Sequence, residues 1–163
     1  MEYEYATRKY ANQIYNLQHA NFKPPYAYSK EDILDFIKNN SIIIVISSEI
    51  SIELPHTNRL VGFIIFAKTN YEFNRRYLVN TIMSLAVDCK FRKQGIAHRL
   101  ITILKSFKKE WYLHVKVDNL PAISLYKSLD FVIIDKIKNY YKQESLDGYY
   151  MRYRDKSLFD KKT

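Results

Sequence analysis

One short stretch combines cationic side chains with a glycine where a helical pattern begins. In "FRKQGIAHRL", Arg92 and Lys93 precede Gly95, one of only 3 glycines in 163 residues. The first N–H groups of a helix are unpaired and carry the positive end of the helix dipole. Because glycine lets backbone approach a phosphate closely, the stretch suits a pyrophosphate-bearing ligand. A glycine needed only for a positive φ in a tight turn explains the same residue equally well.

A histidine in the apolar stretch "WYLHVKV" is the best candidate for a general base. An ordinary imidazole titrates near neutral pH, so His114 suits proton transfer. The alternation of a strand places it on the same face as Tyr112 and Lys116. On these residues alone, a histidine hydrogen-bonded beside the sheet with no catalytic task is the simpler interpretation.

The remaining histidines and the single cysteine do not form a metal site by spacing. His19, His56 and His98 lack ligand spacing with one another and with Cys89, so we expect no metal. We interpret Cys89 as a passive loop residue.

Hydrophobic periodicity predicts one continuous domain, residues 1–154, followed by a tail at 155–163. Strands are predicted at 3–7, 41–48, 59–68, 77–87, 111–117, 131–141 and 148–153. Helices are predicted at 7–22, at 29–39, from the stretch around Gly95 to about 108, and at 119–129. The prolines of "FKPPYAY" separate the first two helices. A hairpin around Pro55 and Asn58 joins the second and third strands.

These elements position the candidate residues in an α/β (α+β) fold. Ser29 and Asp32 form a capping-box pattern, and Asn119 is a candidate N-cap. The strand–helix–strand unit from Thr81 to Val117 should be parallel and right-handed. The order of elements predicts a mixed, mostly antiparallel sheet with a parallel strand pair and helices on both faces.

Composition limits the class of protein. The apolar fraction of 47% supports a packed core, and the longest apolar run, "SIIIVIS", is strand-sized rather than membrane-spanning. With no signal-peptide pattern and one cysteine, we expect a cytoplasmic protein. The formal net charge of +9 fits general solubility, a phosphate-bearing ligand or nucleic acid, in decreasing order.

Two motifs resemble one enzyme superfamily. "FRKQGIAHRL" matches the Arg/Gln-x-x-Gly-x-Gly/Ala signature of the GCN5-related N-acetyltransferases (GNAT), and it lies between a long strand and a helix as in that family. "VDNLPAISLYKSLDF" resembles the later family pattern Asn-x-x-Ala-x-x-x-Tyr-x-x-x-Gly-Phe. "IMSL", "YLHVKVDN", "KNYYK" and "FKPPY" are similar to protein N-terminal (Nα) acetyltransferases of the San/NatE and NatF types. The resemblance runs from about Ala20 to Tyr153.

The resemblance implies a single-domain GNAT-like fold that transfers acetyl from acetyl-CoA to the α-amino group of protein N-termini. It implies catalytic roles for His114 acting through water, Tyr126 near the thioester sulfur, and Thr81. It implies coenzyme binding by Leu85, Ala86, Val87, Arg92, Lys93, Gln94, Gly95, Ile96, Ala97, Asn119 and Tyr126. It implies peptide binding by Phe22, Pro24, Tyr26, Met83, Tyr140 and Tyr141.

The chain departs from the family pattern at two places. Asp130 replaces the glycine before Phe131, so we expect the turn there to differ. Thr81 stands where the San and NatF types carry a tyrosine that helps to order a catalytic water, and threonine reaches less far. Ala97 at the second Gly/Ala position is acceptable.

Several alternatives remain open from the sequence. Tyr126 also fits a core aromatic, and Asn119 also fits a simple helix cap. A GNAT enzyme acting on internal lysine or a small-molecule amine, or a catalytically weak acetyl-CoA-binding protein, would share these motifs. Expected partners are acetyl-CoA and protein N-termini, with ribosome or auxiliary-subunit association left open. We expect no specific DNA binding and no membrane span.

Overall fold

A computed structural model of the chain describes residues 1–47 and 59–158. It divides into two compact units, Met1–Phe66 with Ser84–Leu100, and Ala67–Met83 with Ile101–Thr163. Strands β3 and β4 and helix α3 each run from one unit into the other, and the units are described separately below.

The described residues form a mixed sheet and four α-helices. The strands are β1 (Glu2–Tyr5), β2 (Ile42–Ser47), β3 (Arg59–Tyr71), β4 (Asn74–Val87), β5 (Glu110–Lys116), β6 (Val132–Tyr141) and β7 (Leu146–Arg154). The helices are α1 (Ala11–Asn21), α2 (Lys30–Lys38), α3 (Ile96–Phe107) and α4 (Leu120–Ser128). Short 3₁₀ turns lie at Arg8–Tyr10, Cys89–Phe91, Lys142–Glu144 and Lys156–Leu158.

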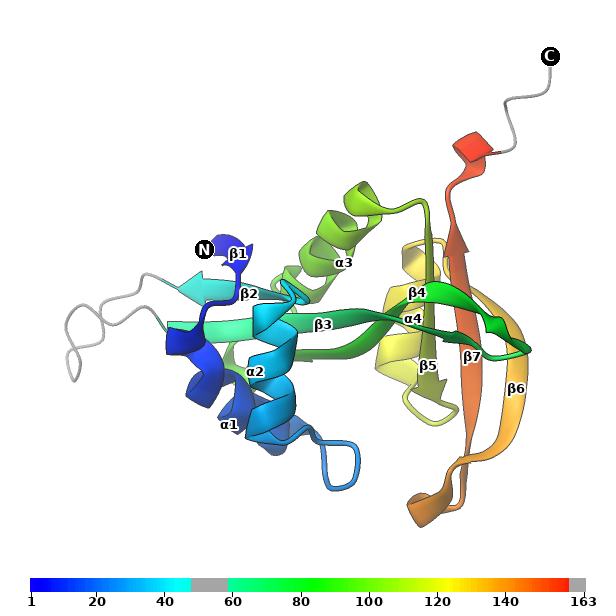
Figure 1. Cartoon of the computed structure of the whole chain (residues 1–163), viewed down its shortest axis with the longest axis horizontal. Helices are drawn as coiled ribbons and strands as arrows, with labels where there is room; N and C mark the ends of the chain where they lie inside the picture. Colours follow the sequence, from blue (N-terminus) through cyan, green and yellow to red (C-terminus); the bar gives the residue numbers. More distant parts are fainter. Residues whose placement is uncertain (48–58, 159–163) are drawn as a thin grey trace. The chain divides into compact units, whose positions relative to one another are not determined.

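The strand pairing confirms the predicted mixed sheet with a parallel pair. The hydrogen-bonded order is β1-β2-β3-β4-β5-β7-β6, and the strands are labelled in Figure 1. β4 and β5 are parallel, with Thr81 opposite Tyr112. β2 and β3 are antiparallel as predicted, whereas the predicted turn residues Pro55 and Asn58 lie outside the described residues.

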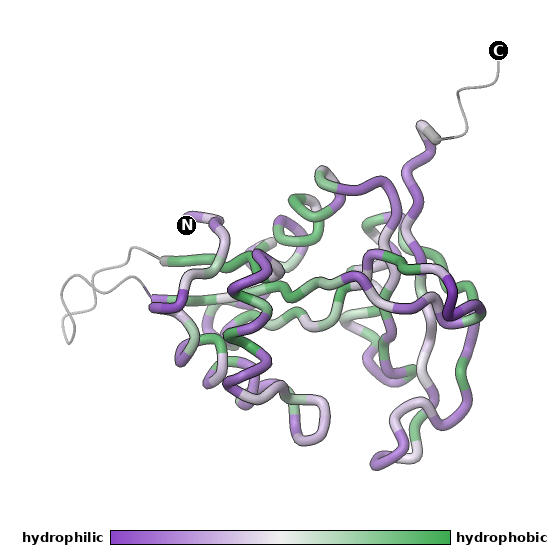
Figure 2. Tube along the Cα trace, viewed as in Figure 1, coloured by the Kyte–Doolittle hydropathy of each residue, from purple (hydrophilic) through white to green (hydrophobic). Residues whose placement is uncertain are grey.

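In the first unit, apolar strands and amphipathic helices bury a common core. Figure 2 shows β2 and the start of β3 as largely hydrophobic, whereas α1 and α2 mix hydrophilic and hydrophobic residues. Ile14 of α1 and Ile33 of α2 are both fully buried. The predicted capping box is present, because the Ser29 hydroxyl accepts from the Asp32 N–H at 3.1 Å and the Asp32 carboxylate accepts from the Ser29 N–H at 3.0 Å.

In the second unit, β5 pairs with β7 and β7 pairs with β6, all antiparallel. Trp111 lies on the buried face of β5. Its indole N–H donates to the Leu104 carbonyl of α3 at 3.0 Å. The opposite face of β5 carries Tyr112 and His114, as the alternation predicted. Because His114 lies directly opposite Tyr150 in the β5–β7 register, the sheet brings these two side chains together.

The turn after α4 corrects one expectation. Asp130 takes a left-handed φ of 64°, and the Phe131 N–H donates to the Tyr126 carbonyl at 3.0 Å. Glycine adopts this conformation most easily, but aspartate also tolerates it. The replacement of glycine by Asp130 is therefore accommodated without a different turn.

No helix in the described part of the chain is long and apolar enough to cross a membrane.

Candidate active site

The loop before α3 has the geometry that its sequence predicted. Gly95 has a φ of 75°, and its carbonyl accepts the Arg99 N–H at 2.9 Å, so the helical hydrogen bonds start here. A Cβ added to Gly95 would meet no described atom within 4 Å, so the space in front of this glycine is open. The positive φ bears out the turn interpretation, and the open space beside Gly95 leaves room for the predicted phosphate.

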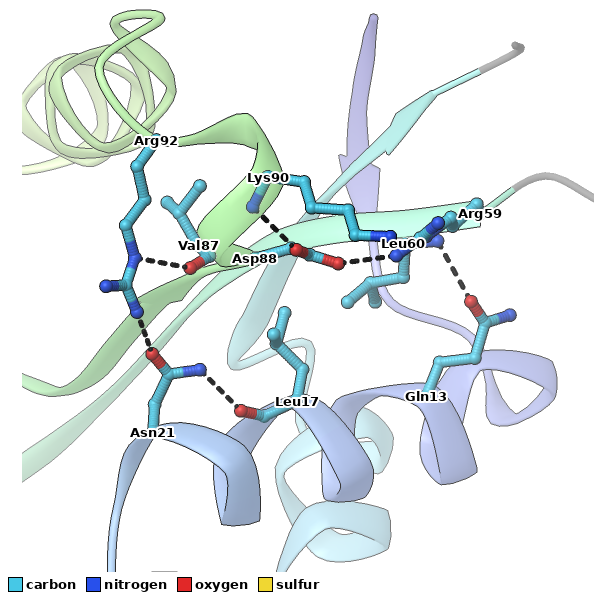
Figure 3. A network of polar contacts seen from close by, with 9 residues as sticks. All are labelled: Gln13, Leu17, Asn21, Arg59, Leu60, Val87, Asp88, Lys90 and Arg92. Atoms are coloured by element: carbon cyan, nitrogen blue, oxygen red, sulfur yellow. Dashed lines mark hydrogen bonds and ion pairs between the residues drawn. The ribbon is translucent and has the colours of Figure 1, made fainter. Parts of the chain in front are cut away.

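The Arg92 side chain makes two hydrogen bonds within the first unit. Its Nε donates to the Val87 carbonyl at 3.2 Å, and its guanidinium donates to Asn21 Oδ1 at 2.7 Å (Figure 3). Asn21 in turn donates to the Leu17 carbonyl at 2.7 Å. The side chain of Arg92 therefore binds the end of β4 and the end of α1, while its backbone stays in the loop.

Asp88 fixes the first turn of the same loop. Its carboxylate accepts the Lys90 N–H at 2.9 Å and pairs with Arg59 at 2.7 Å (Figure 3). Burial alone would raise the pKa of Asp88, but these hydrogen bonds and the Arg59 charge outweigh it and leave the pKa below its usual range. The loop from Val87 to Gly95 is thus held by side chains of its own unit.

The "FKPPY" segment follows α1 in the first unit. Its two ends are bound to Gln18, a fully buried residue of α1. The Phe22 N–H donates to the Gln18 backbone carbonyl at 2.8 Å, and the Tyr28 N–H donates to Gln18 Oε1 at 3.1 Å. Pro24 and Tyr26, predicted to contact peptide, lie between these two anchored ends.

His114 lies between two tyrosine rings in the second unit. Its ring centroid is 4.3 Å from that of Tyr140 and 4.6 Å from that of Tyr150, at interplanar angles of 10° and 19°. Tyr141 contacts Tyr140 edge-to-face, at 5.1 Å between centroids. The structure therefore brings the predicted base together with two of the predicted peptide-binding residues.

Gly148 makes room for this stack. A Cβ at Gly148 would lie 3.0 Å from Cβ of Tyr140 and 3.2 Å from its ring, closer than side chains normally approach. Gly148 lies opposite Lys116 on β5, next to the His114–Tyr150 pair. A side chain at this position would compete with Tyr140 for the space beside His114.

The basicity of His114 differs from the sequence expectation. Burial lowers its pKa from 6.5 to about 4, so the ring is neutral at pH 7. Nε2 lies 3.5 Å from Glu72 Oε2 but forms no hydrogen bond with any described residue. With a neutral ring, this contact is a buried nitrogen facing a carboxylate, not an ion pair.

Tyr126 and Asn119 lie on or beside α4 in the second unit. Tyr126 is 7% exposed, and burial raises the pKa of its phenol to about 12, so it stays protonated. Its ring also packs 5.7 Å from that of Phe131, consistent with a core role. Asn119 accepts the Ala122 N–H at 3.3 Å, which confirms the predicted helix cap.

Thr81 is less available than its predicted role requires. It is 6% exposed, and its hydroxyl lies 2.6 Å from that of Thr69 in a hydrogen bond. Met83 follows on the same strand. Residues 85–87, predicted to bind coenzyme through their backbone, belong to the first unit, where Ala86 and Val87 are buried.

Among residues 1–47 and 59–158, no group of three or more His, Cys, Asp or Glu side chains is placed to hold a metal ion. Cys89 is exposed and unbridged. His56 lies outside the described residues.

Comparison with known families identifies the fold. The model of the Acetyltransferase (GNAT) family matches residues 11–131. The chain belongs to this family. An N-alpha-acetyltransferase of Saccharolobus solfataricus is 38% identical over 76 residues, which are 43% of this chain and 45% of that protein. The chain spans about half the length of the curated relatives it matches.

Solved structures share the fold over nearly the whole chain. Arabidopsis thaliana NAA60 in complex with a bisubstrate analogue has a TM-score of 0.79 at 21% identity, covering 95% of this chain and 98% of that one. Arabidopsis thaliana Naa50 in complex with the bisubstrate analogue CoA-Ac-MVNAL has a TM-score of 0.70 at 26% identity, covering 93% and 96%.

Sequence reasoning missed three residues that contact His114 or Arg92. Glu72 lies in the turn between β3 and β4, where a carboxylate normally indicates solvent exposure. Tyr150 is one of 15 tyrosines, and only the β5–β7 register selects it. Asn21 is 71 residues from Arg92, and no local pattern connects the two.

Proposed function

We propose that the chain transfers the acetyl group of acetyl-CoA to the α-amino group of protein N-termini. The similarity to the N-alpha-acetyltransferase of Saccharolobus solfataricus, 38% over 76 residues, carries this proposal. The geometry of the loop around Gly95 and the His114 stack support it.

The coenzyme fits the loop of the first unit. Its pyrophosphate accepts hydrogen bonds from backbone N–H groups of residues 92–97, where Gly95 leaves open space. Backbone N–H groups at Leu85 and Val87 suit the developing oxyanion of the thioester carbonyl. In the second unit, Asn119 and Tyr126 are the proposed coenzyme contacts.

The reaction joins the amine nitrogen to the acetyl carbonyl carbon and breaks the carbon–sulfur bond. The nitrogen loses its proton toward His114, and the sulfur leaves as a thiolate. An ordinary thiol has a pKa of about 8.5. Because the pKa of Tyr126 is about 12, its phenol serves as a hydrogen-bond donor to the thiolate rather than as a full proton donor.

An α-amine loses its proton more easily than a lysine amine does, whichever base receives the proton. Moving a proton to an imidazole with a pKa of about 4 costs about 9 kcal/mol from a lysine amine and about 5 from an α-amine. At pH 7 roughly a tenth of an α-amine is already neutral, so it needs little help. The proposed peptide contacts are Phe22, Pro24 and Tyr26 in the first unit. In the second unit they are Met83, Tyr140 and Tyr141.

A second candidate is a catalytically weak acetyl-CoA-binding protein. The hydrogen bond between Thr81 and Thr69 favours it, because that contact occupies part of the hydrogen-bonding capacity of the Thr81 hydroxyl. Acetyl-CoA binding without turnover on any amine would identify this alternative. A GNAT enzyme of internal lysine or small amines predicts turnover without a requirement for an N-terminal peptide.

The domain bounds, the cellular location and the partners of the enzyme are part of the same proposal. Residues 1–154 form the acetyltransferase domain, since β7 ends at Arg154, and 155–163 form a tail. The domain works in the cytoplasm, with a ribosome or an auxiliary subunit as an additional partner.

A peptide library tests this function. Peptides that vary in their first and second residues are incubated with acetyl-CoA and the products are measured by mass spectrometry. We expect acetylation of the α-amine of a subset that shares its first residues. No acetylation of any member would contradict the proposal.

A further inference from the structure

The second unit places a buried ring nitrogen of His114 opposite the carboxylate of the exposed residue Glu72, with no hydrogen bond between the two. His114 Nε2 and Glu72 Oε2 are 3.5 Å apart, on side chains that are 16% and 38% exposed. Nε2 is buried and makes no hydrogen bond with any residue that the structure describes. A buried polar atom without a partner is costly, so its place in a folded protein calls for a ligand or a function.

The chemistry of this pair selects its ligand. In the tautomer that carries its proton on Nδ1, the neutral imidazole offers Nε2 as an acceptor, and the carboxylate offers only acceptors. A nitrogen bearing two or more protons can lie at about 2.9 Å from both atoms, since two such contacts span 3.5 Å as a triangle. The negative charge of Glu72 favours a cationic or partly cationic donor.

We propose that Glu72 and His114 together receive the α-amine of the peptide substrate. This inference rests on the proposed function and adds the residue that recognises the amine itself. Glu72 attracts the ammonium form and accepts one N–H, while Nε2 of His114 accepts another. A peptide without an N-terminal amine leaves both acceptors unpaired.

The surrounding side chains hold this pair in place. Tyr140 and Tyr150 enclose the imidazole on both faces. Tyr150 also contacts Phe73, the residue after Glu72, with ring centroids 5.7 Å apart. Lys116, two residues along β5, pairs with Glu144. The aromatic cluster therefore holds the imidazole of His114 and the backbone beside Glu72.

Calorimetry with two matched ligands tests the site without depending on turnover. The probes are a substrate peptide with a free α-amine and its deamino analogue, titrated at pH 7 into enzyme loaded with unacetylated CoA. We expect the wild type to bind the amino peptide about tenfold more tightly, as for a hydrogen bond to a charged group. Glu72→Gln should reduce this ratio to about two, while CoA affinity stays unchanged.

Asp130→Asn is the matched control, because it removes one carboxylate charge from the same unit at a side chain that is 69% exposed. It should keep the wild-type ratio. The inference would be overturned if wild type and Glu72→Gln showed the same ratio of affinities for the two peptides. It would also be overturned if the wild type bound both peptides equally well and yet acetylated the α-amine. A retained ratio in a wild type that acetylates no α-amine would support the site and overturn the proposed function.

Discussion

The Arg92 guanidinium donates a hydrogen bond of 2.7 Å to Asn21, the last residue of α1. This contact joins the loop that carries Gly95 to the start of the "FKPPY" segment, both within the first unit. Two segments with separate predicted roles, coenzyme binding and peptide binding, are thus connected by one charged side chain.

Loss of the Asn21 side chain should therefore affect both ligands. Asn21→Ala removes a partner of Arg92 in an exposed contact, so we expect a modest effect of about two- to fivefold on acetyl-CoA affinity and on the peptide KM. Calorimetry and steady-state kinetics measure the two effects. Asn16→Ala, on the same helix and outside this network, is the control, and identical behaviour of the two variants would show that the contact couples nothing.

Gly95 is expected to be intolerant of a charged side chain. At a φ of 75° glutamate is strained, and its carboxylate would face the proposed pyrophosphate. Gly95→Glu should weaken acetyl-CoA binding at least tenfold, measured by calorimetry. Gly95→Asn controls for backbone strain, because asparagine tolerates positive φ. Unchanged affinity in the glutamate variant would place the coenzyme elsewhere.

Gly148 should be required for the position of Tyr140. The Cβ of Gly148→Ala would lie 3.0 Å from Cβ of Tyr140, so we expect a loss of about 1–3 kcal/mol in the free energy of unfolding. The peptide KM should rise because the ring moves from His114. Adding Tyr140→Gly, which removes that Cβ, should recover part of the stability, as measured by urea unfolding. If Gly148→Ala alone were as stable as the wild type, Tyr140 would be able to move without a loss of stability.

His114 should make the protein less stable in mild acid. Its pKa is about 4 when folded and 6.5 otherwise, so between these values the unfolded chain binds a proton that the folded chain does not. The stability from a neutral buried ring is complete above pH 6.5 and is lost as the pH falls toward 4. This lowering of the pKa corresponds to about 3 kcal/mol.

Urea unfolding at pH 7 and pH 4.5 measures this effect. The loss of stability on acidification should be smaller in His114→Gln than in wild type, whereas His98→Gln, at an exposed position, should lose as much as wild type. Equal losses in all three proteins would show that the His114 ring is protonated in the folded state.

Local patterns predicted much of the fold and part of the site. The capping box at Ser29, the cap at Asn119 and the turn at Gly95 depend on residues within a few positions, and the structure contains all three. The alternation of β5 correctly placed His114 on its face. The parallel β4–β5 pair followed from the strand–helix–strand order.

Contacts between residues far apart in the sequence account for the features that the sequence did not predict. The low pKa of His114 follows from burial beside Tyr140 and Tyr150, which depends on the β5–β7 register and on Gly148. The contact between Arg92 and Asn21 joins segments 71 residues apart. Such distances carry no periodic signal, so neither contact could be predicted from one sequence.

The site of acetylation on a single peptide tests the proposed function most directly. The peptide carries a free α-amine and one internal lysine, and fragmentation in the mass spectrometer locates the acetyl group after reaction with acetyl-CoA. We predict acetyl on the α-amine in large excess over lysine at pH 7. Acetyl found mainly on the lysine side chain would contradict α-amine transfer.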